Sequence, residues 1–120
     1  MSLLTQTVQT GDWSNEKHVP EIDFESVENG KVKIRAAVGT EIEHPNTLEH
    51  HIAWIKVFFQ AEGAQFPVEI ASSEFTAHGE DDLYTIPCAT GYIKAGKKGT
   101  IYALSYCNIH GLWENSAELN

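Results

Sequence analysis

The chain has 120 residues, of which 42% are hydrophobic, 17 are acidic and 8 are basic, giving a formal net charge of −9. This size and composition favour one globular domain over residues 1–120 and argue against disorder. The negative charge argues against nucleic acid as a partner because it would repel phosphates, and no apolar stretch is long enough to span a membrane. Residues 1–13 lack the pattern of a signal peptide, so we expect a cytoplasmic location.

The first half of the chain is expected to begin irregularly and then to form a β-hairpin. Residues 1–20 show no periodic pattern. In residues 22–38, apolar side chains alternate with charged ones on both sides of Asn29-Gly30, a dipeptide typical of tight turns. A polar stretch over residues 39–49 follows and is expected to be a loop.

The remaining segments have the length and composition of short strands separated by turns. Strands are predicted over residues 51–59, 66–75, 83–87, 91–94 and 100–106, with a turn at 96–99 and a short closing strand over 112–117. The run HIAWIKVFF at 51–59 is expected in the core, with an interface as the alternative. Because no long segment has helical periodicity, we expect an all-β fold, an antiparallel β-sandwich of about seven strands.

Histidine and cysteine are the residue types that call for a functional interpretation. Two cysteines do not make a disulfide framework, and in a reducing compartment they are free thiols or metal ligands. Six histidines are many for so short a chain and point to a metal site. These residues are Cys88, Cys107, His18, His44, His50, His51, His78 and His110.

Three segments concentrate the candidate ligands, and each lies in a predicted loop or at the edge of a strand. They are EKHVP at 16–20, HPNTLEHH at 44–51 and CNIHG at 107–111. Taken alone, each has an ordinary structural explanation, such as a solvated loop, a turn or a buried cysteine. In the third segment, however, the two-residue gap between Cys107 and His110 lets a tight turn direct a thiolate and an imidazole at one ion. Loops can bring the three segments together, which strengthens the metal hypothesis.

These strings resemble the superoxide reductase family in its short form, neelaredoxin, which is related to the iron domain of desulfoferrodoxin. The resemblance rests on E-K-H-V-P, H-P-N-T-x-E-H-H-I and C-N-I-H-G-L-W-E and extends from about Asp12 to Trp113. It implies an immunoglobulin-like topology for the sandwich. The cysteine-rich iron domain of longer relatives has no counterpart here, so one iron centre is expected.

The resemblance also implies the roles of individual residues. Four imidazoles would surround a ferrous ion, the thiolate of Cys107 would be its axial ligand, and Glu16 would bind opposite only in the oxidised state. Lys17 would stand near that open position without binding metal. The four imidazoles would be those of His18, His44, His50 and His110. His51, His78 and Cys88 match no ligand position and are interpreted as structural.

The implied activity is the one-electron reduction of superoxide to hydrogen peroxide, with an external donor returning the electron. Rubredoxin or a similar small electron-transfer protein is the expected donor, and a homotetramer, or alternatively a dimer, is the expected assembly. On an acidic protein, the ion and Lys17 would provide the local positive charge that attracts an anionic substrate. A carboxylate from Glu16 would offset the charge gained by the ion on oxidation.

Several other functions remain open on the residues alone. A superoxide dismutase would release oxygen as well as peroxide. A blue-copper or other non-catalytic electron-transfer sandwich would use two histidines, a cysteine and a weak axial methionine, but the one methionine is Met1. A structural zinc site needs four ligands, fewer than the candidates present. A non-catalytic binding module is the remaining alternative, since a sandwich fold does not determine function.

Overall fold

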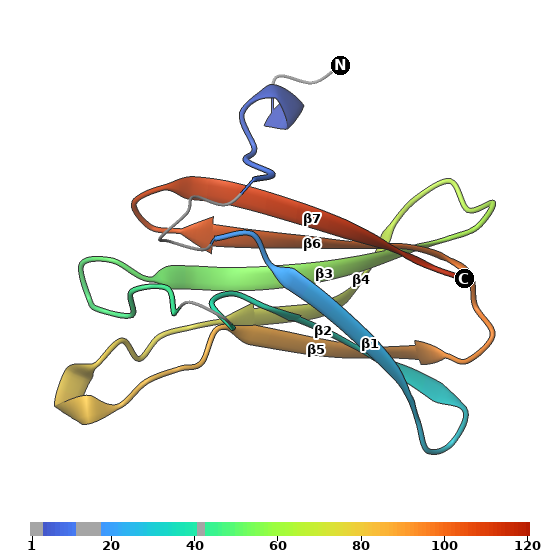
Figure 1. Ribbon diagram of the computed structural model, residues 1–120, viewed down its shortest axis with the longest axis horizontal. Coiled ribbons are helices and arrows are strands. Elements are labelled where there is room, and N and C mark those ends of the chain that lie inside the picture. The colour runs from blue at the N-terminus through green and yellow to red at the C-terminus, as the bar shows by residue number, and fades with distance from the viewer. Residues whose placement is uncertain (1–3, 12–17, 41–42) are drawn as a thin grey trace.

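The computed structural model describes residues 4–11, 18–40 and 43–120. In this part of the chain, seven strands form two antiparallel sheets (Figure 1). The strands are β1 (Glu21–Val27), β2 (Lys31–Ala37), β3 (Ile52–Ala61), β4 (Val68–Glu74), β5 (Cys88–Lys94), β6 (Gly99–Cys107) and β7 (Gly111–Leu119). Two 3-10 turns, η1 (Leu4–Gln6) and η2 (Glu80–Asp82), complete the elements. No helix among these residues is long and apolar enough to cross a membrane.

The two sheets have the strand orders β1-β2-β5 and β4-β3-β6-β7. This arrangement confirms the predicted immunoglobulin-like β-sandwich of seven strands. Here the fourth strand pairs with the third, whereas in constant-type immunoglobulin domains the fourth strand pairs with the fifth. Residues near Gln9 extend the larger sheet, since the Gln9 N–H donates to the Leu112 carbonyl and the Glu114 N–H donates to the Gln9 carbonyl.

Alternation of side chains between the two faces of each strand builds the core. On β6, Ile101, Ala103, Ser105 and Cys107 all point inward and are wholly buried. The inward face of this strand is therefore apolar at its start and polar at its end. The β6–β7 turn lies at the same end of the sandwich as the start of β3 (Figure 1). The candidate ligands in the segments 44–51 and 107–111 are therefore at that end.

Most of the predicted strands are confirmed with modest shifts of their ends. The hairpin at 22–38 is β1 and β2, joined by a loop in which Asn29 and Gly30 have φ angles of 66° and 65°. The run at 51–59 corresponds to β3, but only one of its faces is in the core. Ile55 and Val57 are wholly buried, whereas Trp54, Lys56 and Phe58 on the other face are half-buried.

The predicted strand over 83–87 is wrong. Leu83 and Ile86 are more than 60% exposed, and the segment forms an isolated bridge between Tyr84 and His78 and scattered hydrogen bonds, such as that from the Thr85 N–H to the Ala77 carbonyl, in place of a strand. It follows η2, where Asp81 and Asp82 have positive φ angles that interrupt extended pairing. The strand that follows, β5, begins at Cys88, so the prediction of 91–94 captured only its second half.

Candidate metal centre

Four residues from three distant segments bring their metal-binding atoms together at one end of the sandwich. One donor atom from each of His18, His44, His50 and Cys107 lies within 4.8 Å of the others. Metal–imidazole and metal–thiolate bonds are about 2.1 and 2.3 Å long, so donors on opposite sides of one ion lie about 4.2–4.4 Å apart. The spacing therefore fits a single metal ion.

His110 is the fifth member of this group. Its Nδ1 lies 3.2 Å from Nε2 of His18 and 3.9 Å from Sγ of Cys107. Cys107 and His110 are brought together by the β6–β7 turn, in which Cys107 pairs with Gly111 and Gly111 has a φ of 80°. A three-residue loop followed by a left-handed glycine is a common hairpin connection. The turn predicted to direct thiolate and imidazole at one point is therefore present.

The four imidazoles form a closed cycle of contacts around the shared centre. Going around the cycle His18, His44, His50, His110, neighbouring ring centres are 4.6, 4.8, 5.0 and 5.1 Å apart. Neighbouring rings are inclined by 73° to 88°, so each presents its edge to the next. With a metal–nitrogen distance of about 2.1 Å, two imidazoles whose bonds to one ion meet at a right angle would have ring centres about 4.6 Å apart. The cycle is thus slightly wider than a loaded site requires.

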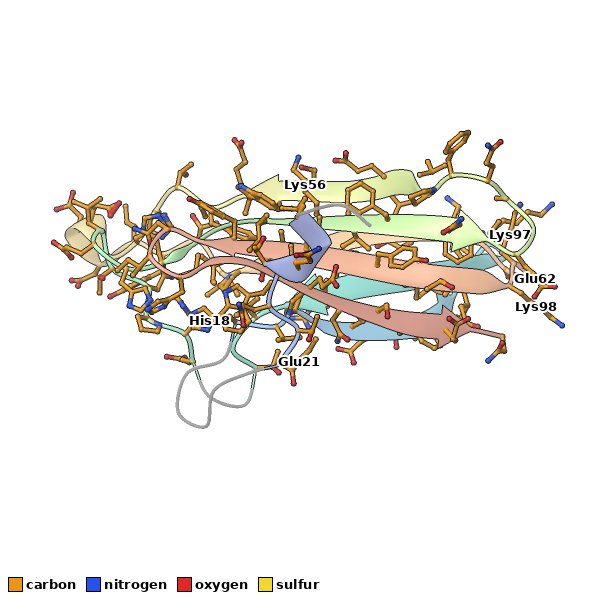
Figure 2. All side chains as sticks on the ribbon, turned by 90° about the horizontal axis from the view of Figure 1, so that it is seen from above. His18, Glu21, Lys56, Glu62, Lys97 and Lys98 are labelled. Carbon is orange, nitrogen blue, oxygen red and sulfur yellow. The ribbon has the colours of Figure 1, made fainter. Side chains whose placement is uncertain are left out.

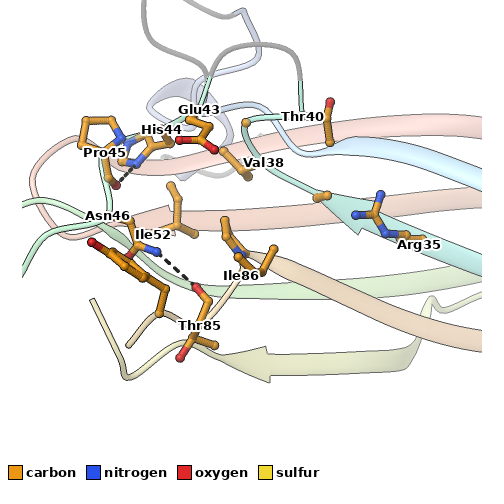
Figure 3. A pocket seen from close by; sticks show the side chains of 14 residues that line it. Arg35, Val38, Thr40, Glu43, His44, Pro45, Asn46, Ile52, Thr85 and Ile86 are labelled. Atoms are coloured by element: carbon orange, nitrogen blue, oxygen red, sulfur yellow. Dashed lines mark hydrogen bonds between the residues drawn. The ribbon is translucent and has the colours of Figure 1, made fainter. Parts of the chain in front are cut away.

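Hydrogen bonds orient several of these donors. Nδ1 of His44 lies 2.7 Å from the Pro45 carbonyl and must carry the proton, since a carbonyl only accepts. Its Nε2 therefore keeps a lone pair and lies 3.6 Å from Sγ of Cys107. Figure 3 marks the contact of His44 with the Pro45 carbonyl. The buried Ser105 hydroxyl donates to the His18 carbonyl over 2.6 Å and thereby anchors the segment that carries His18.

Burial separates the donors into two groups. His18 and Cys107 are wholly buried and His44 is 7% exposed, whereas His50 and His110 are half-buried. Figure 2 shows His18 toward one end of the sandwich, with Lys97 and Lys98 at the opposite end. His50 and His110 are therefore the most exposed of the five candidate donors.

A cavity of about 550 Å³ lies beside the cluster but does not enclose it (Figure 3). Of the five donors, only His44 contributes to its wall. Arg35, Val38, Tyr84 and Ile86 are among the other lining residues. The cavity therefore borders the cluster only through His44.

The remaining residues singled out from the sequence fall into two groups. Glu16 and Lys17 lie outside the described residues, so their predicted roles stay predictions. His51 turns away from the cluster, and its ring stacks on His78 with centres 3.5 Å apart and planes inclined by 8°. Cys88 is half-buried at the start of β5 and is not part of the cluster.

Two contacts of the site were not predicted from the sequence. The Trp113 indole stacks on the His18 ring, and the side chain of Asn108 bonds to the backbone on both sides of His50. Both residues lie within the C-N-I-H-G-L-W string. Their closeness in sequence to Cys107 and His110 could have suggested a role at the site. Asparagine and tryptophan are not typical metal ligands, however, so neither residue was singled out.

Comparisons with known proteins agree with this geometry. The desulfoferrodoxin family model matches residues 10–116. A superoxide reductase from Pyrococcus horikoshii is 54% identical over 98% of this chain and 99% of its own length. The neelaredoxin of Megalodesulfovibrio gigas is 44% identical over 90% of both chains. A crystal structure of superoxide reductase in the oxidised state superposes with a TM-score of 0.91 at 50% identity, covering 98% of this chain and all of the other.

Proposed function

This chain belongs to the desulfoferrodoxin family and is an oxidoreductase that reduces superoxide, and we propose that it does so at one mononuclear non-haem iron. His18, His44, His50 and His110 would provide four imidazole ligands and Cys107 a thiolate. The donor chemistry and the spacing of the cluster identify it as a metal site. The identity of the ion as iron is the proposal.

The convergence of five donors on one centre is the observation that carries this proposal. Four imidazoles and one thiolate exceed the four ligands of a structural zinc site. They also differ from the two histidines, one cysteine and axial methionine of blue-copper sites. A five-donor set leaves a sixth position of an octahedral ion for substrate.

The side chains around that position have different roles. When bound, iron cycling between Fe²⁺ and Fe³⁺ supplies the single electron that superoxide takes up. The thiolate of Cys107 would hold the ion and donate electron density to it, and the complete burial of Cys107 shields the sulfur from oxidation. The hydrogen bond from Nδ1 of His44 to Pro45 keeps its Nε2 unprotonated and available as a ligand.

Two residues outside the described part of the chain complete the proposal. Lys17 would attract the anionic substrate and hold a proton near it, and Glu16 would bind at the open position in the oxidised state. Their support is the E-K-H-V-P string shared with the family. A positive group is needed locally because the chain as a whole carries a net charge of −9 and would repel an anion.

The partners are proposed on the same resemblance. Superoxide is the substrate, and rubredoxin or a similar small iron protein would return the electron after each turnover. We keep a homotetramer, with a dimer as the alternative, a single domain over residues 1–120 and a cytoplasmic location as predictions.

The amounts of hydrogen peroxide and oxygen formed for each superoxide consumed test this function. Reduced protein should convert superoxide to hydrogen peroxide without releasing oxygen, and turnover should stop when the electron donor is exhausted. Release of one oxygen for each peroxide, without a donor, would identify dismutation instead. Cys107→Ala should abolish donor-dependent peroxide formation, whereas Cys88→Ala, which removes the thiol outside the cluster, should not.

A further inference from the structure

Asn108 occupies the first position of the loop between β6 and β7, directly after Cys107 and two residues before His110. It has no role in the donor set described above. Its side chain does not face the shared centre but reaches across to the loop that carries His50. It is therefore placed between two groups of candidate ligands that are more than 50 residues apart in sequence.

Three hydrogen bonds join Asn108 to the backbone around His50. Its Oδ1 accepts from the His51 N–H over 2.8 Å, and its Nδ2 donates to the Glu49 carbonyl over 3.0 Å. Its own N–H donates to the His51 carbonyl over 3.1 Å. The two side-chain hydrogen bonds are made to the backbone immediately before and immediately after His50. One amide therefore satisfies both flanking peptide groups, a pairing that fixes orientation as well as distance.

The loop to which Asn108 is hydrogen-bonded also contains hydrogen bonds between its own residues. The Thr47 N–H donates to the His50 carbonyl over 2.9 Å, and the His50 N–H lies within bonding distance of both the Thr47 carbonyl and its hydroxyl. Nδ1 of His51 donates to the same Thr47 carbonyl over 2.9 Å. Residues 47–51 therefore form a small rigid unit, and its position relative to Cys107 and His110 depends on what joins the two loops.

We propose that Asn108 is a positioning residue that sets His50 against Cys107 and His110, so that the donors are assembled before a metal ion binds. The inference rests on the proposed metal centre. Displacement of the loop would move His50, which is only half-buried and so is less restrained by packing than His18 or His44. A donor displaced from its bonding position contributes little to metal affinity, and groups that orient ligands commonly contribute about 10- to 100-fold.

Co²⁺ titration of the metal-free protein tests this directly, since cobalt binding through a thiolate gives visible bands and does not depend on superoxide chemistry. Asn108→Ala should raise the dissociation constant of Co²⁺ about 10- to 100-fold and change the band positions. Asn108→Asp keeps the acceptor for the His51 N–H but loses the donor to Glu49, so its loss should be smaller. An Asn108→Ala protein with wild-type bands and an affinity within twofold of wild type would overturn the proposal.

Gln60→Ala is the matched control. The Gln60 amide also ties a loop to a strand, donating to the Ala64 carbonyl over 3.1 Å and accepting from the Tyr102 hydroxyl over 3.1 Å. It lies near the end of β3 farthest from the site. Its replacement should leave Co²⁺ affinity within twofold of wild type. A loss equal to that of Asn108→Ala would mean that any weakening of a loop lowers affinity, and would overturn the positioning role.

A double-mutant cycle separates positioning from general stability. Because Asn108 acts through His50, Asn108→Ala should change Co²⁺ affinity less than twofold in a His50→Ala background. A full, additive loss in that background would overturn the proposal. If Asn108→Ala does not fold, Asn108→Asp takes its place in every comparison, and a wild-type affinity for it is then the overturning result. Wild-type protein without a thiolate–cobalt band would instead refute the metal centre itself.

Discussion

The indole of Trp113 lies flat against the imidazole of His18, with ring centres 4.3 Å apart and planes inclined by only 10°. Both residues are wholly buried. The contacts of the His18 ring with His44 and His110 are instead inclined by 73° and 88°. Trp113 therefore provides a flat surface against which this candidate ligand is oriented.

Replacing Trp113 should be costly because it removes the largest wholly buried side chain among the described residues. Trp113→Ala should lower the free energy of unfolding of the metal-free protein by about 3–5 kcal/mol, measured by urea denaturation. Trp54→Ala on the half-buried outer face of β3 is the control and should cost less. Equal losses for the two variants would contradict a special packing role of Trp113.

Removing the Ser105 hydroxyl should destabilise the segment that carries His18. Ser105→Ala leaves the buried His18 carbonyl without the hydrogen bond that Ser105 donates over 2.6 Å. The expected loss is about 1–3 kcal/mol of unfolding free energy. Ser72→Ala, which removes an exposed hydroxyl bonded to Lys56, should change stability by no more than about 0.5 kcal/mol. A Ser105→Ala protein as stable as Ser72→Ala would show that this bond is replaced or unimportant.

The His51–His78 stack predicts a dependence of stability on pH. Burial, and then repulsion from His51, lower the pKa of His78. The unfolded chain takes up this proton near its usual pKa of about 6.5, so between the two pKa values it binds more protons than the folded chain. The free energy of unfolding should therefore decrease as the pH falls below about 6.5.

His78→Phe keeps a ring for the stack but cannot titrate. Urea denaturation at pH 7.5 and 5.5 should show a smaller decrease for this variant than for the wild type. The other histidines are present in both proteins, so the difference between the two decreases reports on His78. Identical decreases would contradict the lowered pKa.

Lys17 should matter for the encounter with substrate. Lys17→Ala should slow the second-order reaction of the reduced protein with superoxide roughly tenfold at low ionic strength, and should weaken the fall of the rate with added salt. Lys97→Ala makes the same change in net charge at the end of the sandwich opposite His18 (Figure 2) and should have little effect. An unchanged rate for Lys17→Ala at low salt would remove this residue from the mechanism.

The prediction was right where apolar alternation and a turn signal coincide, and it was wrong where length and composition alone suggested a strand. Residues 22–38 carry both the period-two pattern and a turn dipeptide, and they form the expected hairpin. Residues 83–87 carry apolar side chains but follow two aspartates with positive φ angles and find no neighbouring strand. Pairing depends on partners distant in the chain, which a local pattern does not contain.

Histidine and cysteine at short spacing suggested a metal site, but each segment alone also had an ordinary structural explanation, and the set of five donors came from the resemblance to superoxide reductases. The residues that support these donors were not predicted. The roles of Asn108 and Trp113 depend on which loop or ring lies opposite them once the sheets pack. That information arises only in the folded chain, where β6 and β7 lie beside the loop at 47–51.

Metal content together with the visible spectrum of the oxidised and reduced protein tests the central claim most directly. We expect one iron per chain and a thiolate-to-Fe³⁺ charge-transfer band that disappears on reduction, returns with superoxide and is lost in Cys107→Ser. Zinc or copper in place of iron, or an iron band that persists in Cys107→Ser, would contradict a superoxide-reducing iron centre at these residues.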